Sequence, residues 1–103
     1  MIKITASRKD GKIVNLTVKG HANSAPHGED LVCAAVSSIL VGGCNALKIP
    51  NCFAIKLNEG DASIVEINHA NEHDYEVLET MMIQFKTIEE SSKKFLSVIE
   101  KGN

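Results

Sequence analysis

The sequence predicts an α+β fold in which two β-hairpins form one sheet and two helices cover it. Each hairpin consists of two segments in which apolar and polar residues alternate, and each pair is followed by apolar residues at helical spacing. Short polar turns, Arg8-Lys9-Asp10-Gly11 and Glu59-Gly60-Asp61, separate the two segments of each pair. The expected order is therefore ββαββα, with a short last strand left open.

The first hairpin ends at a histidine. Residues 2–7 alternate and residues 12–20 alternate again, so the second strand delivers Gly20-His21 to its end. A histidine at the end of a strand is exposed enough to exchange protons and is still held by a rigid backbone. This position makes His21 a candidate for acid–base chemistry.

The first helix is expected over residues 30 to about 47, where apolar residues cover almost the whole circumference. A helix that is apolar on all sides is typical of a buried position. Gly42-Gly43 lowers helix stability by roughly 1 kcal/mol per glycine. Close packing against another element is the favoured reason for these glycines, with a helix end there as the alternative. Pro50 ends the segment.

The second half of the chain repeats the pattern. Residues 52–58 and 62–68 are the expected strands of the second hairpin. A helical spacing of apolar residues then predicts the second helix from about Glu72 to about Ser91. Residues 95–99 either extend this helix or form a short strand, and periodicity alone does not decide between the two.

Composition bounds the class of protein. A chain of 103 residues with 44% hydrophobic residues is expected to be one folded domain, residues 1–103. The net charge of -2 leaves no basic footprint, so we expect protein partners and no direct contact with nucleic acid. No apolar run reaches the roughly 20 residues of a membrane span, and residues 1–5 alternate instead of forming a signal peptide's apolar region. Three cysteines, an odd number, indicate reduced thiols and a cytoplasmic location.

A histidine and a cysteine lie at the two ends of one short connection. Asp30 is the expected N-cap of the first helix, which places Cys33 in the first turn, where free N–H groups and the helix dipole favour a thiolate. Eleven residues separate His21 from Cys33, enough for the chain to fold back and bring imidazole and thiol within hydrogen-bond reach. This arrangement suits a thiol nucleophile with an imidazole base. Backbone N–H groups at the helix start, including that of Cys33, are the expected oxyanion donors.

These residues also have purely structural interpretations. On position alone, Cys33 is better explained as a core thiol and His21 as a turn or capping residue. His27 competes with His21 as the base, but its loop fixes geometry poorly. Ser37 lies one turn beyond Cys33 on the same helix face, where it either lines the site or is a small residue at a helix contact. No aspartate is placed as the third member of a triad, so we expect a His/Cys dyad.

The other potential ligands do not predict a metal site. His69 and His73 are four residues apart, but the interval crosses a predicted helix start. Cys44 and Cys52 are interpreted as core thiols. We therefore expect no metal and no cofactor.

One ordered motif links the candidate residues. The run is Gly20-His21-Ala22, five loop residues, Gly28-x-Asp30, then Leu31-Val32-Cys33-Ala34-Ala35-Val36-Ser37. It resembles the signature of the ribosomal-processing cysteine proteases, the Prp family. The motif is long and ordered, and it is therefore far more specific than a bare histidine–cysteine pair. The rest of the chain fits the family in length and element order, and only loosely in sequence.

The resemblance implies a small cytoplasmic endopeptidase of bacteria that is usually a homodimer. Such enzymes remove a short N-terminal extension from large-subunit ribosomal protein twenty-seven, cleaving after a phenylalanine, and so support ribosome assembly. By position, His21 and Cys33 match the family's catalytic pair. Asp30 and Ser37 match positions beside them, and Gly28 belongs to the same motif.

The chain departs from the family at one point, and two other functions stay open. The family commonly has glycine after the His-Ala pair, where this chain has Asn23 and, further on, Pro26. The loop 22–29 is nevertheless expected to order over substrate. The main alternative is a non-catalytic ribosome-assembly or protein-binding module whose Cys33 is merely buried; the other is acyl transfer from the thiol to an acceptor other than water. The resemblance also favours a strand at residues 95–99.

Overall fold

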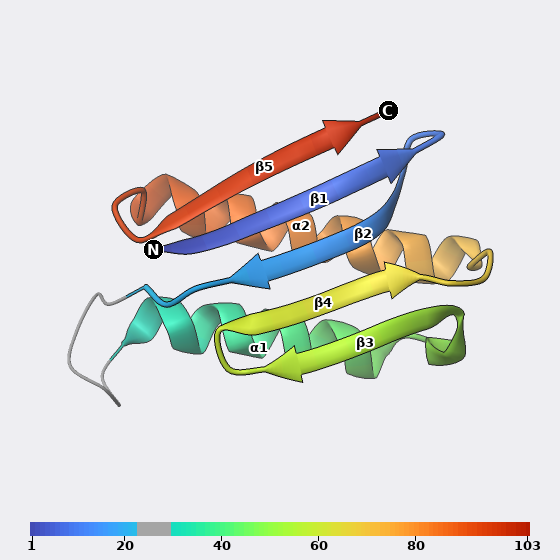
Figure 1. Ribbon diagram of the computed structural model, residues 1–103, viewed down its shortest axis with the longest axis horizontal. Coiled ribbons are helices and arrows are strands. Elements are labelled where there is room, and N and C mark those ends of the chain that lie inside the picture. The colour runs from blue at the N-terminus through green and yellow to red at the C-terminus, as the bar shows by residue number, and fades with distance from the viewer. Residues whose placement is uncertain (23–29) are drawn as a thin grey trace.

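The computed structural model describes residues 1–22 and 30–103. Its elements are β1 (Ile2–Lys9), β2 (Lys12–Lys19), α1 (Leu31–Ala46), the short 3-10 helix η1 (Pro50–Cys52), β3 (Phe53–Asn58), β4 (Asp61–Glu66), α2 (Glu72–Ser91) and β5 (Leu96–Gly102) (Figure 1). Both predicted hairpins and both predicted helices are present. The segment left open between helix and strand contributes residues 96–99 to β5, which confirms the strand. No helix in the described ranges is long and apolar enough to cross a membrane.

The strands form one five-stranded sheet with the order β3-β4-β2-β1-β5, and both helices lie on the same face of this sheet (Figure 1). β5 runs parallel to β1, whereas the other neighbouring strands are antiparallel. The two hairpins meet where β2 pairs with β4, with Lys19 opposite Asp61. The turn between β3 and β4 therefore lies beside the end of β2, which is where His21 leaves the sheet.

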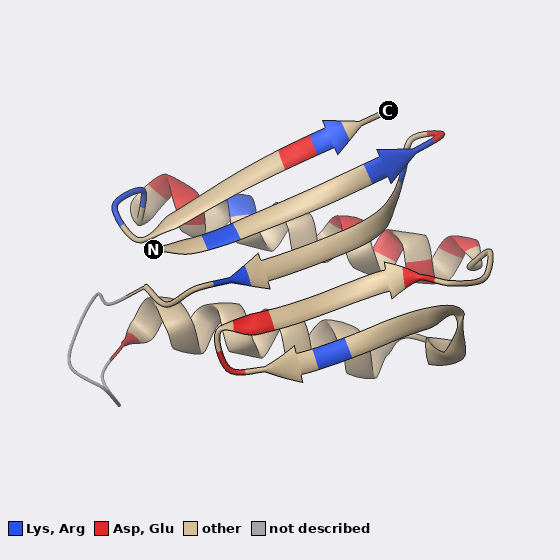
Figure 2. Cartoon of the chain, viewed as in Figure 1, with Lys and Arg blue, Asp and Glu red and all other residues tan. Residues whose placement is uncertain are grey.

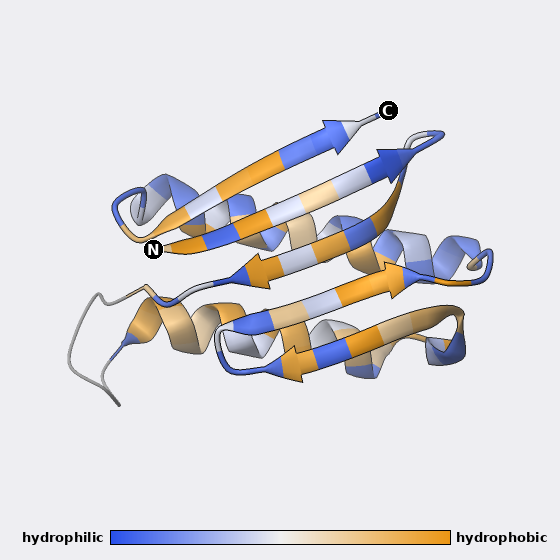
Figure 3. Ribbon diagram, viewed as in Figure 1, coloured by the Kyte–Doolittle hydropathy of each residue, from blue (hydrophilic) through white to orange (hydrophobic). Residues whose placement is uncertain are grey.

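The core lies between the sheet and the two helices. Apolar residues alternate along the strands (Figure 3), and the inward-facing Ile4, Leu16 and Ile64 are at most 1% exposed. Helix α2 adds Leu78 and Phe85, which are 1% and 0% exposed. Removing a side chain of this size from water stabilises the fold by roughly 1.5–3 kcal/mol. The alternation seen in the sequence thus marks the face that the helices cover.

The expectation that α1 is buried on all sides is wrong. Along this helix Val36 and Leu40 are buried, whereas Leu31 is 80% and Val41 50% exposed. The layer architecture is the reason, because a helix on one face of a single sheet touches the sheet and one neighbouring helix and leaves an outer side. That outer side is uncharged, since α1 contains no acidic or basic residue (Figure 2).

The two helices approach each other closely at Gly43. A Cβ added there would lie 2.2 Å from Sδ of Met81 in α2, well inside van der Waals contact. A Cβ added at the neighbouring Gly42 would meet nothing within 4 Å. The predicted reason for the glycine pair, close packing inside a continuous helix, is therefore confirmed for Gly43, and the alternative of a helix end is excluded.

A buried carboxylate joins the end of α1 to the start of α2. Asp74 is 0% exposed and accepts hydrogen bonds from the backbone N–H groups of Lys48 (2.8 Å) and Ile49 (2.9 Å). Burial disfavours its charged form, but these donors and the neighbouring His73 outweigh burial and hold the pKa of Asp74 below its usual value. Asp74 thus anchors the connection that sets the position of α1 relative to α2.

Candidate active site

His21 emerges at a point where the backbone requires glycine. Gly20, the residue after β2, has φ 94°, and a Cβ there would lie 2.4 Å from the carbonyl oxygen of Met1. Its N–H donates to the carbonyl of Gly60 at 3.0 Å. This hydrogen bond holds the end of β2 against the β3–β4 turn. The next residue in the chain is His21, which is exposed.

The β3–β4 turn forms a wall against the imidazole of His21. Gly60 has φ 71°, and a Cβ added at this residue would lie 2.6 Å from His21 Nε2. The ring therefore rests on the bare Cα of the turn. Glycine serves two purposes here, because it adopts the left-handed conformation and leaves room for the ring.

The nucleophile candidate lies at the start of α1, as the sequence predicts. Asp30 is the N-cap, and its side chain accepts a hydrogen bond from the Cys33 N–H at 3.0 Å. The N–H of Ala22 donates to Cys33 Sγ at 3.4 Å. This contact joins the end of the first hairpin directly to the thiol.

The surroundings of Cys33 act on its ionisation in the direction opposite to that expected from the helix start. Burial raises the pKa of the Cys33 thiol, and the Ala22 N–H only partly opposes this effect. The carboxylates of Asp30 and Glu59 raise the pKa further, because each disfavours a nearby negative sulfur. The free protein therefore holds Cys33 as a thiol more firmly than the helix dipole alone suggests.

A pocket of about 210 Å³ gathers the predicted residues. His21, Cys33 and Ser37 all line it, which brings together two segments on either side of the connection. Its remaining lining comes from β1, from β2 and the glycine after it, from α1, and from the end of β3, the following turn and the start of β4, namely Ile2, Val18, Gly20, Val36, Leu40, Asn58, Glu59, Gly60, Asp61 and Ala62. A thiol, an imidazole and an exposed serine hydroxyl thus share one concave site.

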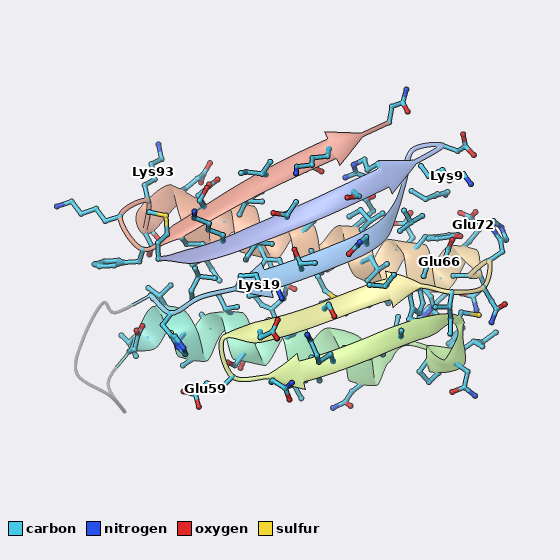
Figure 4. The ribbon with its side chains drawn as sticks, viewed as in Figure 1. Lys9, Lys19, Glu59, Glu66, Glu72 and Lys93 are labelled. Carbon is cyan, nitrogen blue, oxygen red and sulfur yellow. The ribbon has the colours of Figure 1, made fainter. Side chains whose placement is uncertain are left out.

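The turn brings two carboxylates to this pocket, and they differ in their partners. Asp61 pairs with Lys19 and, at 2.9 Å, with Lys56, and these ammonium groups lower the pKa of Asp61. Glu59 is exposed at the tip of the same turn (Figure 4). Its charge is the one that reaches Cys33.

Sequence reasoning missed the turn residues as part of the site. Glu59-Gly60-Asp61 was expected to be a hairpin turn, and it is one. Nothing local indicated that this turn would meet a histidine almost forty residues earlier in the chain. The pairing of β2 with β4 brings the turn to His21. This pairing joins distant segments, so no single segment of the sequence predicts it.

Some predicted features lie outside the described residues or outside the pocket. Gly28 belongs to residues 23–29, as do Asn23, Pro26 and His27, so all four lie outside the described ranges. Asp30 contacts the Cys33 backbone without lining the pocket. Within residues 1–22 and 30–103, no three His, Cys, Asp or Glu side chains are grouped to hold a metal ion.

Comparison with known proteins identifies the family. The family model described as cysteine protease Prp matches residues 1–97. The chain belongs to the cysteine protease Prp family. The ribosomal processing cysteine protease Prp of Bacillus subtilis (strain 168) is 34% identical over 107 residues, covering 95% of this chain and 96% of the relative. That of Staphylococcus aureus (strain Mu50 / ATCC 700699) is 31% identical over 86 residues, covering 79% and 80%.

Solved Prp structures share the fold. A crystal structure of the essential ribosomal processing protease Prp from S. aureus, with a covalently linked product peptide, has a TM-score of 0.88 at 29% identity and covers 98% of this chain and 100% of that chain. A second S. aureus structure, with a substrate peptide, has a TM-score of 0.82 at 28% identity and the same coverage. The predicted α+β class and the expected membership of the Prp family are thus confirmed, and the chain is a cysteine protease.

Proposed function

We propose that this Prp-family chain is an endopeptidase in which His21 and Cys33 form the catalytic dyad of one protease domain, residues 1–103. The observation that carries the assignment is the shared pocket, which His21 and Cys33 both line. Cys44 and Cys52, the other two cysteines, do not line this pocket. In a cysteine protease, the thiol beside an imidazole is the group suited to attack a peptide bond.

The raised pKa of Cys33 favours a mechanism in which His21 acts as a general base. His21 takes the proton from Sγ as the sulfur attacks the scissile carbonyl. The resulting imidazolium then protonates the leaving amine, and the acyl chain remains on Cys33 as a thioester. Water attacks this thioester while His21 accepts its proton, which releases the new carboxyl terminus and restores the thiol.

The structure changes the expectation for the oxyanion donors. The Cys33 N–H, expected to be one of them, is engaged by the Asp30 side chain in the free protein. The Ala22 N–H already points at the sulfur. Substrate binding must therefore either release one of these N–H groups or use another at the start of α1.

The supporting residues take different parts. Asp30 caps α1 and so fixes the position of Cys33 in the first turn. Ser37 is exposed within the pocket, where its hydroxyl is placed to contact a bound peptide. Gly28 is proposed as a supporting residue on the motif alone.

The proposed substrate is the N-terminal extension of large-subunit ribosomal protein twenty-seven, cut after a phenylalanine. Support comes from the motif and from the relatives, which are named ribosomal processing proteases and include structures with substrate and product peptides. A cytoplasmic location without direct nucleic-acid contact agrees with the net charge of -2.

A homodimer is the proposed assembly. The uncharged outer side of α1, with Leu31 and Val41 exposed, supports it because large exposed apolar patches on a protein surface mark interaction sites. Light scattering on the purified protein tests the proposal directly. A mass of one chain would contradict it.

The experiment that tests the function is cleavage of ribosomal protein twenty-seven from the same organism, followed by mass spectrometry. Wild type should produce one cut near the N-terminus, and Cys33→Ala should produce none. Cys44→Ala is the matched control, because Cys44 is another half-buried thiol of α1 outside the pocket. Cleavage that survives in Cys33→Ala would remove Cys33 from the mechanism. No cleavage together with an unreactive Cys33 would favour the binding-module alternative.

A further inference from the structure

The imidazole of His21 is not oriented by a carboxylate. In a catalytic triad an acidic residue holds the histidine ring in place, and a dyad needs another means of doing so. Glu59 and Asp61 are the described carboxylates that line the pocket, and within residues 1–22 and 30–103 neither pairs with His21. A different contact must therefore set the position of the ring.

That contact is with the backbone of the β3–β4 turn. A Cβ added at Gly60 would lie 2.6 Å from Nε2, 2.9 Å from Cε1 and 3.4 Å from Cδ2 of His21. The edge of the ring that carries Nε2 therefore faces Gly60, and this close approach is possible because glycine has no side chain. The turn thus limits how far the imidazole can move in this direction.

The turn is held more firmly than the ring. Residues 59–60 alone separate β3 from β4 (Figure 1), and the carbonyl of Gly60 accepts a hydrogen bond from the N–H of Gly20 at 3.0 Å. Asp61, the first residue of β4, forms ion pairs with one lysine of β2 and one of β3. His21, in contrast, is exposed. A side chain added at residue 60 would therefore displace the ring and leave the turn in place.

We propose that Gly60 is a positioning residue for catalysis, whose bare Cα keeps the imidazole of His21 in the pocket that it shares with Cys33. The turn takes the place that a carboxylate has in a triad. This inference rests on the proposed His21–Cys33 dyad and names the residue that orients its base. Because the contact restricts the ring without binding the peptide, it should affect the rate of the chemical step and not the affinity for substrate.

The distances give the size of the effect. The carbon of a methyl group needs about 3.5 Å to a neighbouring ring atom, whereas the Cβ position of residue 60 lies 2.6 Å from His21 Nε2. Gly60→Ala must therefore move the ring by about 1 Å, and a displacement of about this size can slow a reaction on the order of 100-fold. In cleavage of a synthetic peptide that spans the proposed site, Gly60→Ala should lower kcat about 100-fold and leave KM near the wild-type value.

Gly11→Ala is the matched control. Both glycines lie in hairpin turns with positive φ, 71° at Gly60 and 78° at Gly11, so alanine introduces the same left-handed strain at either position. A Cβ added at Gly11 meets nothing within 4 Å. The two variants should therefore have similar melting temperatures, and only Gly60→Ala should lose activity. Equal kcat values would overturn the positioning role. A Gly60→Ala variant that unfolds while Gly11→Ala folds would also overturn it, because the turn and not the ring would have moved.

The second test measures the thiol without substrate. Iodoacetamide alkylation of Cys33 at neutral pH reports how well the imidazole assists the thiol. Gly60→Ala should slow alkylation toward the rate of His21→Ala, and the double variant should react at the same rate as His21→Ala, because residue 60 acts through the ring. If Gly60→Ala slows alkylation equally with and without the imidazole, the turn acts on Cys33 by another route and the proposal is refuted.

The two tests separate this inference from the function on which it rests. If His21→Ala cleaves the peptide and is alkylated as fast as wild type, the proposed dyad is wrong, and the role of Gly60 is wrong with it. If His21→Ala loses cleavage while Gly60→Ala keeps the wild-type kcat, the dyad stands and only the positioning role is wrong. If wild type cuts no peptide, the protease function fails, and the alkylation rates still decide whether Gly60 positions the ring.

Discussion

The adjacent glycines of α1 offer a paired test of how closely the helices pack. Gly42→Ala places a methyl group in open space, whereas Gly43→Ala places one 2.2 Å from Met81 Sδ. Both changes gain about 1 kcal/mol of helix propensity. Only the second must also displace a buried side chain, since Met81 is 2% exposed.

The magnitudes follow from these two effects. Overpacking a well-filled site costs about 1–3 kcal/mol, so Gly43→Ala should range from neutral to about 2 kcal/mol destabilising. Gly42→Ala should stabilise the protein by about 1 kcal/mol. In terms of melting temperature, 1 kcal/mol corresponds to about 4 °C for a domain of this size.

Urea unfolding followed by circular dichroism measures both variants against wild type. The Met81→Ala background provides a further check, because it opens the space that the new methyl group needs. In that background Gly43→Ala should stabilise the protein by about 1 kcal/mol, as expected for helix propensity alone. If Gly43→Ala proves as stabilising as Gly42→Ala in the wild-type background, the close contact at Met81 is absent.

The remaining predictions concern charge. Asp30→Asn and Glu59→Gln should each lower the pKa of Cys33, because both carboxylates raise it; the pH profile of Cys33 alkylation, read by peptide mass spectrometry, should move to lower pH. Asparagine caps a helix as well as aspartate does, so the Asp30→Asn variant should melt near the wild-type temperature. An alkylation profile that moves to higher pH would contradict the effect assigned to the two carboxylates. The pKa of Asp74 is lowered in the folded state. Its contribution to the free energy of unfolding is therefore fully present above about pH 4, the pKa in the unfolded chain, and is lost as the pH falls through the pKa in the folded protein. Asp74→Asn should therefore lessen the loss of unfolding free energy in acid. The measurement is urea unfolding at a series of pH values. If the unfolding free energy of the variant falls in acid as steeply as that of wild type, Asp74 does not contribute to the acid sensitivity.

Local sequence signals predicted the elements because their causes are local. Alternation marked the strands, helical spacing gave α2 the bounds it has in the structure, and Asp30 is the N-cap that was expected. Residues 95–99 were ambiguous because five residues are too few for periodicity to separate a strand from a helix extension. Parallel pairing with β1, a contact across most of the chain, makes this segment a strand.

The exposure of α1 and the ionisation of Cys33 were misjudged for one shared reason. Both depend on what surrounds a helix, and the sequence of the helix describes only the helix. An apolar circumference predicted burial, but the layer architecture leaves an outer side. A helix start predicted a favoured thiolate, but burial and two carboxylates act in the opposite direction.

By itself, the sequence determined the α+β class, the order of the elements, and a histidine and a cysteine at the two ends of one connection. Each of these follows from patterns within about twenty residues. Only the tertiary structure decided that β4 lies beside β2, which carries the β3–β4 turn to His21 and makes that turn part of the pocket. Strand order and register arise from contacts between distant segments, whose free energy depends on the whole sheet and its helices at once.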